Sequence, residues 1–421
     1  MPDLGVTGVT ICRMRFRKTI LPLVILAILA VLLYQIPAVN TRLEWRVELA
    51  RVYLRGLFTP AGSLPAPIPT AAAQVTATVP PTQTVTPTPP GPTPTSIPSA
   101  TPLPQMVNLT PPKWVKQDIN NCGPTTLSLY LNYYGWRGDQ FEIANEIKPE
   151  RLDKNVNVEE LIYFSRNWAG WLQSNFRVGG DIQLLKTFLA AGFPIMVEEG
   201  YALERGYWID DDQWAGHYLL LTGYDDAAQV FITQDTYVGP NELVSYDKLD
   251  EGWKAFNRVY FILYLPSQEE AVKSILGPHW DSDFNRQAAM ETAQAEAAAN
   301  PQDAFAWFNV GSNLVYFERY GEAAAAFDQA RQIGLPQRML RYQFGPFISY
   351  FHTLRTADLL ALTEYALEIT DNSEEALLWH GWGLYRLGNS AGAIEYFREA
   401  YWANPKSQDA AYALDFMGAS P

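Results

Sequence analysis

Hydrophobic and polar residues divide the chain into four stretches of different character. Residues 19–39 run TILPLVILAILAVLLYQIPAV without a charged side chain and are long enough to cross a bilayer as a helix. Residues 59–112 are dominated by Pro and Thr, a composition that cannot form a packed core. Residues 113–266 show both helical and strand patterns, whereas residues 284–418 are helical and rich in Ala. The pattern predicts an N-terminal transmembrane helix, a disordered stalk and two folded domains.

The stretch 113–266 has the pattern of an α+β domain. Apolar residues recur at helical spacing in four segments, which predicts helices at 123–134, 140–146, 157–167 and 181–191. β-branched and aromatic residues concentrate in four others, which predicts strands at 194–198, 217–224, 229–235 and 258–265. Helices therefore come first in this domain and most of the sheet follows.

The strands 217–224 and 229–235 are separated by a short polar segment and predict a hairpin. If its turn centres on Ala227, residue 219 faces residue 235. His217 and Asp235 then lie on one face of the sheet as diagonal neighbours. A slip of one residue would separate them.

Charge is spread unevenly along the chain, whose formal net charge is −14. Residues 1–58 carry eight basic and three acidic side chains, so the remainder carries −19. Such an acidic remainder disfavours nucleic acid as a partner. The basic residues just before residue 19 place residues 1–18 in the cytoplasm by the positive-inside rule, although the arginines of the juxtamembrane segment 40–58 nearly match them in number. A cleaved signal peptide, with Ala38 near the cleavage point, is the alternative.

The chain has two cysteines, Cys12 and Cys122, which the predicted membrane segment separates. Cys122 stands at the first turn of the helix predicted at 123–134. Helix N-terminal amides favour a thiolate over a thiol, so Cys122 is a candidate nucleophile, with a buried structural cysteine as the alternative. His217 is the single histidine of 113–266 and the available general base, and Asp235 could orient its ring. Gln117 is the best-placed side-chain donor for an oxyanion, and Asn120 or Asn121 could substitute.

These residues carry a resemblance to a known family. Gln117, the helix start Asn121-Cys122-Gly123-Pro124, the strand start Gly216-His217-Tyr218 and the strand end Asp235 resemble the bacteriocin-processing, double-glycine-leader peptidases and their stand-alone relatives. The resemblance implies a papain-like cysteine peptidase fold. It also implies Cys122 as nucleophile, His217 as base and acid, Asp235 as orienting residue and Gln117 as oxyanion donor. Thr236 follows Asp235 where relatives often have Pro.

The C-terminal stretch, 284–418, shows a repeat. Gly311 and Gly381 are 70 residues apart, or two units of 35. Aromatic and small residues recur around each of them at the spacing of a tetratricopeptide repeat: Trp307, Tyr320, Ala323, Phe327, Ala330 and Pro336, then Leu384, Ala393, Phe397, Ala400 and Pro405. The region between is degenerate, and 285–301 resembles a partial first repeat. The resemblance implies an all-α repeat domain that either binds a peptide or protein partner or serves as a structural appendage.

The expected protein is a single-pass membrane protein whose extracytoplasmic cysteine peptidase acts on a peptide or protein substrate, without cofactor or metal. The acids Asp210, Asp211 and Asp212 fall in a segment, 201–215, that could shape the cleft. A calcium site is conceivable there, but adjacent acids are more typical of a solvated loop. Two other functions fit the same residues. One is an amidase or acyltransferase that resolves the thioester with an amine, and the other is a non-enzymatic binding protein.

Overall fold

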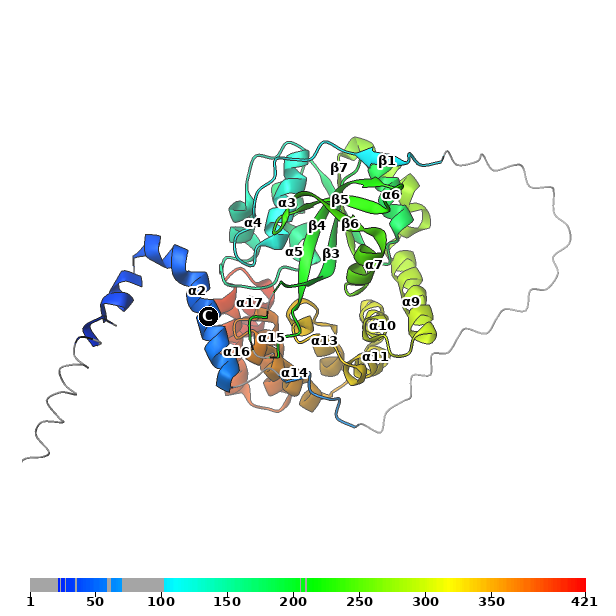
Figure 1. Ribbon diagram of the computed structural model, residues 1–421. Coiled ribbons are helices and arrows are strands. Elements are labelled where there is room, and N and C mark those ends of the chain that lie inside the picture. The colour runs from blue at the N-terminus through cyan, green and yellow to red at the C-terminus, as the bar shows by residue number, and fades with distance from the viewer. Residues whose placement is uncertain are drawn as a thin grey trace, which may run out of the picture. The chain divides into compact units, whose positions relative to one another are not determined.

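The computed structural model describes residues 22, 24–26, 28–34, 36–58, 62–69, 102–204, 206–208 and 210–421 (Figure 1). The chain divides into two compact units, Met1–Pro60 with Tyr207–Ile209, and Ala61–Gly206 with Asp210–Pro421. The first unit contains helix α2 (Pro37–Phe58). The second contains a sheet, the helices that cover it and a C-terminal series of helices.

Part of the predicted transmembrane helix, 19–39, lies outside the described residues. Residues 1–18, which include Cys12, lie wholly outside them. Among the residues that are described, no helix is both long and apolar enough to span a bilayer. The structure therefore does not support this prediction.

The prediction of a disordered stalk over 59–112 is wrong for residues near its two ends. Residues 62–69 hydrogen-bond to C-terminal helices, and 106–108 form strand β1, which pairs with β4. Apolar residues among the prolines cause the difference, because the side chains of Leu64 and Val107 are buried or half-buried against the folded unit. Residues 59–61 and 70–101 lie outside the described part.

The sheet of the described residues has seven strands, in the order β2-β7-β3-β4-β5-β6 with β1 also beside β4, and its pairs are antiparallel. The strands are β1 (Met106–Asn108), β2 (Gln173–Arg177), β3 (Ile195–Ala202), β4 (Trp214–Asp225), β5 (Val230–Asp235), β6 (Gly239–Ser245) and β7 (Tyr260–Tyr264). Antiparallel pairing with helices gathered at the start of the domain is the α+β arrangement that the sequence predicts.

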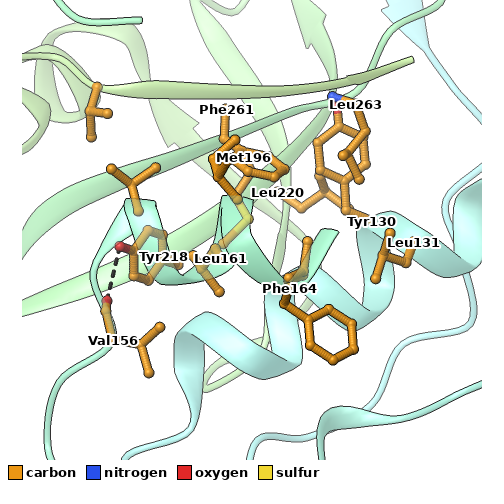
Figure 2. Close-up of a cluster of buried hydrophobic side chains, with 14 of the residues drawn as sticks. Tyr130, Leu131, Val156, Leu161, Phe164, Met196, Tyr218, Leu220, Phe261 and Leu263 are labelled. Carbon is orange, nitrogen blue, oxygen red and sulfur yellow. Dashed lines mark hydrogen bonds between the residues drawn. The ribbon is translucent and has the colours of Figure 1, made fainter. Parts of the chain in front are cut away.

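Two hydrophobic cores flank this sheet. Helices α3 (Cys122–Tyr133), α4 (Gln140–Ile147) and α5 (Val158–Trp168) contribute to one core, which Figure 2 shows around Tyr130, Leu161 and Met196. Helices α6 (Ile182–Ala190), α7 (Tyr246–Lys254) and α8 (Glu269–Leu276) contribute to the other. Along β4, Tyr218 and Leu220 belong to the first core and Leu219 and Leu221 to the second, as the alternation of a strand requires.

Side chains at the helix starts explain where these helices begin. Asp139 accepts hydrogen bonds from two amides of α4, Asp181 accepts one from α6, and Asn157 forms a capping box with Glu160 of α5. The four helices and four strands expected from periodicity are confirmed. Strands β1, β2 and β6 and helix α7 were not expected, because they are short or polar and lack a clear period.

The C-terminal helices pair as α10 with α11, α13 with α14 and α15 with α16. Their bounds, with those of the remaining helices, are α9 (Ser282–Ala299), α10 (Ala304–Tyr316), α11 (Tyr320–Ile333), α12 (Met339–Tyr342), α13 (Gly345–His352), α14 (Thr356–Ile369), α15 (Glu374–Arg386), α16 (Ser390–Ala403) and α17 (Gln408–Phe416). A Cβ at Gly311 would lie 2.6 Å from the Phe327 ring, and one at Gly381 would lie 2.5 Å from the Phe397 ring. The repeat pattern thus marks close helix packing.

Polar contacts fasten these helices to the sheet domain. Lys254 and Asp303 form an ion pair at 2.6 Å, and Asn309 Nδ2 donates to the Lys254 carbonyl at 2.8 Å. The buried Arg338 guanidinium pairs with Asp211 at 2.6 Å. The solvated-loop interpretation is therefore wrong for Asp211, whose side chain is 1% exposed because Arg338 covers it. No group of side chains suited to hold a metal ion occurs in the described part of the chain.

Candidate active site

Cys122 is the first residue of helix α3, where free backbone amides and the helix dipole favour a negative charge. The preceding residue, Asn121, makes no side-chain capping bond to these amides. The thiol is half-buried and packs beside the first core. A Cβ at Gly123 would lie 3.4 Å from the Tyr218 ring, so the helix start approaches β4 closely. These features place the half-buried Cys122 beside the strand that carries His217.

One glutamine holds the loop in front of Cys122. Gln140 Oε1 accepts hydrogen bonds from the Asp118 amide, Asn121 Nδ2 and Thr125 Oγ1, each at 2.8 Å. Its Nε2 donates to the Lys116 carbonyl at 3.0 Å. The Asn121 amide group is therefore used to shape the loop. Likewise, Asn120 Nδ2 donates to the Leu152 carbonyl at 3.3 Å.

His217 and Asp235 meet across the hairpin of β4 and β5. Leu219 pairs with Asp235, as the hairpin predicts. His217 Nε2 and Asp235 Oδ1 are 2.9 Å apart, and both side chains are buried. The same carboxylate oxygen accepts from the amides of Tyr237 at 2.7 Å and Val238 at 3.0 Å. Asp235 is thus fixed by the turn that follows it, and it fixes one nitrogen of the imidazole.

The other partner of His217 is Cys122, and the two groups change each other's acidity. Burial raises the pKa of Cys122, but the hydrogen bond to His217 and its charge outweigh burial, so the pKa is lowered from 9.0. Burial lowers the pKa of His217, but hydrogen bonds to Asp235 and Cys122 outweigh it and raise the pKa to about 10. Burial raises the pKa of Asp235, but the hydrogen bond from His217, the charge of His217 and the amides of Val238 and Tyr237 together outweigh burial and lower the pKa. These opposite shifts favour a thiolate paired with an imidazolium.

Gln117 lies beside the end of β5. Its backbone amide donates to the Thr236 carbonyl at 2.9 Å, and the Thr236 hydroxyl donates to Gln117 Oε1 at 2.9 Å. These two bonds hold the glutamine beside the residue that follows Asp235. Neither bond involves Nε2, the donor atom of the Gln117 side-chain amide.

Several neighbours of the site were not singled out from the sequence. Lys148 is buried and donates to the carbonyls of Asn120 at 2.9 Å and Asp153 at 2.7 Å. Glu199 pairs with His217 in the sheet, and its pKa is raised by burial to about 7. The Tyr201 ring centre lies 5.3 Å from that of His217. Strand pairing of 194–198 with 217–224 could have found Glu199, whereas nothing in the sequence pattern points to Lys148.

Comparisons with known proteins find a matching family model and similar solved structures. Residues 99–262 match the Peptidase_C39 like family. A solved structure described as a C39-like peptidase from Bacillus anthracis is 18% identical, and the match covers 38% of this chain and 97% of that chain with a TM-score of 0.31. The structure of YrrB, described as a TPR protein with an unusual peptide-binding site, is 16% identical. That match covers 35% of this chain and 96% of YrrB, with a TM-score of 0.19. Among curated proteins, none matches.

Residues 99–262 are thus similar to the Peptidase_C39 like family. The family match confirms the resemblance to a cysteine peptidase that the sequence predicts for 113–266.

Proposed function

We propose that this chain is a cysteine peptidase in which Cys122 is the nucleophile, His217 the general base and acid, and Asp235 the residue that orients the imidazole. The observation that carries the proposal is the contact of a helix-N-terminal thiol with an imidazole that is itself bonded to a buried carboxylate at 2.9 Å. The family match over 99–262 supports it. A purely structural cysteine would not require an ionised partner.

The reaction follows from this arrangement. The Cys122 thiolate attacks a peptide carbonyl, and the tetrahedral oxyanion is held by the Cys122 backbone amide and Gln117 Nε2. The imidazolium of His217 gives its proton to the leaving amine, which breaks the peptide bond and leaves a thioester. Neutral His217 then takes a proton from water, the hydroxyl attacks the thioester, and the acid departs as the thiolate forms again.

The decisive experiment is hydrolysis of a peptide library by the full chain and by Cys122→Ala. We expect cleavage by the wild type and none above background by the variant, because the remaining groups supply no nucleophile. The matched control is Ser128→Ala, which removes another small polar side chain of α3 whose hydroxyl donates to the Thr125 carbonyl at 2.7 Å. Equal hydrolysis by Cys122→Ala and wild type would overturn the proposal.

We further propose that the N-terminal segment holds the protein at a membrane, with the peptidase and repeats on the extracytoplasmic side. Support comes from the uncharged run 19–39 and from the exposure of its apolar side chains, such as Leu26 at 67% and Val31 at 60%. Such a row of exposed apolar residues is costly in water. Recovery of the full chain in the membrane fraction after alkaline extraction is the expected result, and recovery in the soluble fraction would contradict it.

A further inference from the structure

Residues 62–69, GSLPAPIP, bind the C-terminal helices as an extended peptide would. The Pro65 carbonyl accepts two hydrogen bonds from the Arg331 guanidinium, from Nε at 3.1 Å and from Nη2 at 2.6 Å. The Ile68 amide donates to Asp358 Oδ1 at 3.1 Å, and Tyr365 Oη donates to the Gly62 carbonyl at 2.7 Å. The backbone of this segment is thus held at three points by α11 and α14, in contacts that span about 270 to 300 positions of sequence.

Side chains of the segment add selectivity to this backbone recognition. Leu64 is 7% exposed, whereas Ile68 is 42% exposed. Prolines at 65, 67 and 69 restrict the backbone and favour the polyproline II conformation, which has three residues per turn. Leu64 and the half-buried Pro67 are three residues apart and therefore lie on the same side. A peptide restricted in this way loses little conformational entropy on binding.

The polar groups that receive the segment belong to a network of the repeats themselves. The Arg331 side chain is 1% exposed and also donates to Tyr350 Oη at 2.8 Å and to Asp358 Oδ1 at 3.1 Å. Arg355 pairs with Asp358 at 2.8 Å and with Asp328 at 2.5 Å. A buried guanidinium and carboxylate are therefore oriented by α11, α13 and α14, and each has bonding capacity directed at a peptide backbone.

We propose that the surface formed by Arg331, Asp358 and Tyr365 is a binding site for an extended peptide of the Leu-Pro-x-Pro type, and that residues 62–69 of this chain occupy it as an intramolecular ligand. The other end of the Pro/Thr segment is fixed as well, because β1 pairs with β4. With the site occupied, only residues 59–61 separate the last residue of α2 from the bound peptide. Occupancy of this site thus determines the length of the unbound chain between α2 and the folded unit.

An intramolecular ligand competes strongly with a free one, because its effective concentration is on the order of millimolar. The wild-type site is therefore closed to a weak free peptide of the same sequence. Disrupting residues 62–69 should open the site without changing it, since those residues lie outside the helices that form it. Leu64→Asp does this by placing a charge at a side chain that is buried in the bound segment.

The test uses an acetylated, fluorescein-labelled peptide of residues 62–69 and measures its fluorescence anisotropy with the full chain. We expect no saturable binding to the wild type and saturable binding to Leu64→Asp. Ala66→Asp is the matched control, because it introduces the same charge at an exposed residue of the same segment, and it should behave as the wild type does. Adding Tyr365→Phe to Leu64→Asp removes one hydrogen bond and should weaken peptide binding by about fivefold.

Three results would overturn the proposal. Failure of Leu64→Asp to bind the peptide, with an unchanged circular dichroism spectrum, would show that the surface is not a peptide site. Equal opening by Ala66→Asp would show that Leu64 is not recognised. A wild-type dimer that Leu64→Asp converts to monomer in sedimentation would show that the segment of a second copy, and not of the same chain, occupies the site.

Discussion

Cys122 and His217 each hold the charged form of the other, and this has a consequence that can be measured. Because the pKa of Cys122 is lowered, the thiolate forms at pH values below 9.0, the ordinary pKa of the group. Because the pKa of His217 is raised to about 10, the imidazolium is present at the same pH values. The stability that His217 gains from its partners is full below pH 6.5 and is lost as the pH rises through about 10. That of Cys122 is full above pH 9.0 and is lost as the pH falls through its lowered pKa.

We therefore expect iodoacetamide to alkylate Cys122 faster at neutral pH than it alkylates an ordinary thiol, because the lowered pKa increases the fraction of reactive thiolate. In His217→Ala the thiolate loses its partner, burial then raises the pKa of Cys122, and the rate at pH 7 should fall by at least tenfold. Mass spectrometry of the alkylated chain measures both rates. His279→Ala, at a histidine in the segment just before α9, serves as the control. A wild-type rate that rises only near the pH of a free thiol would contradict the ion pair.

Thr236 differs from the proline often found after the orienting residue, and here its hydroxyl donates to Gln117 Oε1 at 2.9 Å. Thr236→Val removes that donor and keeps the shape, so Gln117 loses a bond that orients its side-chain amide. If Gln117 stabilises the oxyanion, kcat should fall by about tenfold, the cost of one misplaced hydrogen bond, with little change in KM. Thr236→Ser retains the hydroxyl and should keep wild-type kcat. Equal kcat values for Thr236→Val and Thr236→Ser would show that the Thr236 hydroxyl does not contribute to the reaction.

At the scale of elements, the hairpin of β4 and β5 shows what the sequence pattern predicts correctly and what it does not predict. A turn centred on Ala227 predicts that residue 219 faces residue 235, and Leu219 does pair with Asp235. Yet Asp225 pairs with Val230, and this register, if continued, would bring residue 236 opposite Leu219. A bulge between Leu221 and Gly223 absorbs one residue and restores the pairing. Periodicity cannot locate a bulge, so the agreement near the site depended on a feature that was not predicted.

The sequence pattern also does not predict contacts between elements that are separated along the chain. Gln140 shapes the loop before Cys122 through bonds that exist only once α4 packs beside α3. Asp211 and Arg338 are 127 positions apart, and an acid run by itself favours solvent. The thiol, imidazole and carboxylate could be found from the sequence because their chemistry is rare and their local patterns are strong. The residues that position them are common polar types with no local pattern.

The loop that carries Asp211 allows a test of how the repeats are held. Asp211→Asn removes the nearer of two carboxylates from the buried Arg338 guanidinium and leaves Asp212 at 3.5 Å, and removing one member of such a buried pair costs roughly 3 kcal/mol. Asp210→Asn, at the exposed neighbouring acid, should have almost no effect. Urea unfolding followed by tryptophan fluorescence measures both. Equal midpoints for the two variants would show that the pair does not stabilise the contact between the repeats and the sheet domain.

At the scale of the whole molecule, acidic groups gather where the repeats meet the sheet domain. Asn155 Nδ2 donates to Glu375 Oε1 at 3.3 Å, which joins the segment before α5 to the start of α15. Burial raises the pKa of Glu374 to about 7 and that of Glu375 well above its ordinary value of 4.5. Neighbouring acids, including Glu160 and Asp153, push the pKa of Glu375 in the same direction. The folded chain therefore favours the protonated form of these carboxyls.

The sign of the pH dependence follows from these raised pKa values. The contribution of Glu374 to stability is full below pH 4.5 and is lost as the pH rises through about 7. Thermal unfolding should accordingly occur a few degrees higher at pH 6 than at pH 8. Replacing both acids, in Glu374→Gln with Glu375→Gln, should raise Tm at pH 8 and reduce the difference between the two pH values. Glu395→Gln, at an exposed acid of α16, removes a like charge without this contact and should keep the wild-type difference. A double variant whose Tm falls between pH 6 and pH 8 as much as that of the wild type would mean that the pH dependence comes from other groups, such as His217, or from the overall negative charge, and not from this junction.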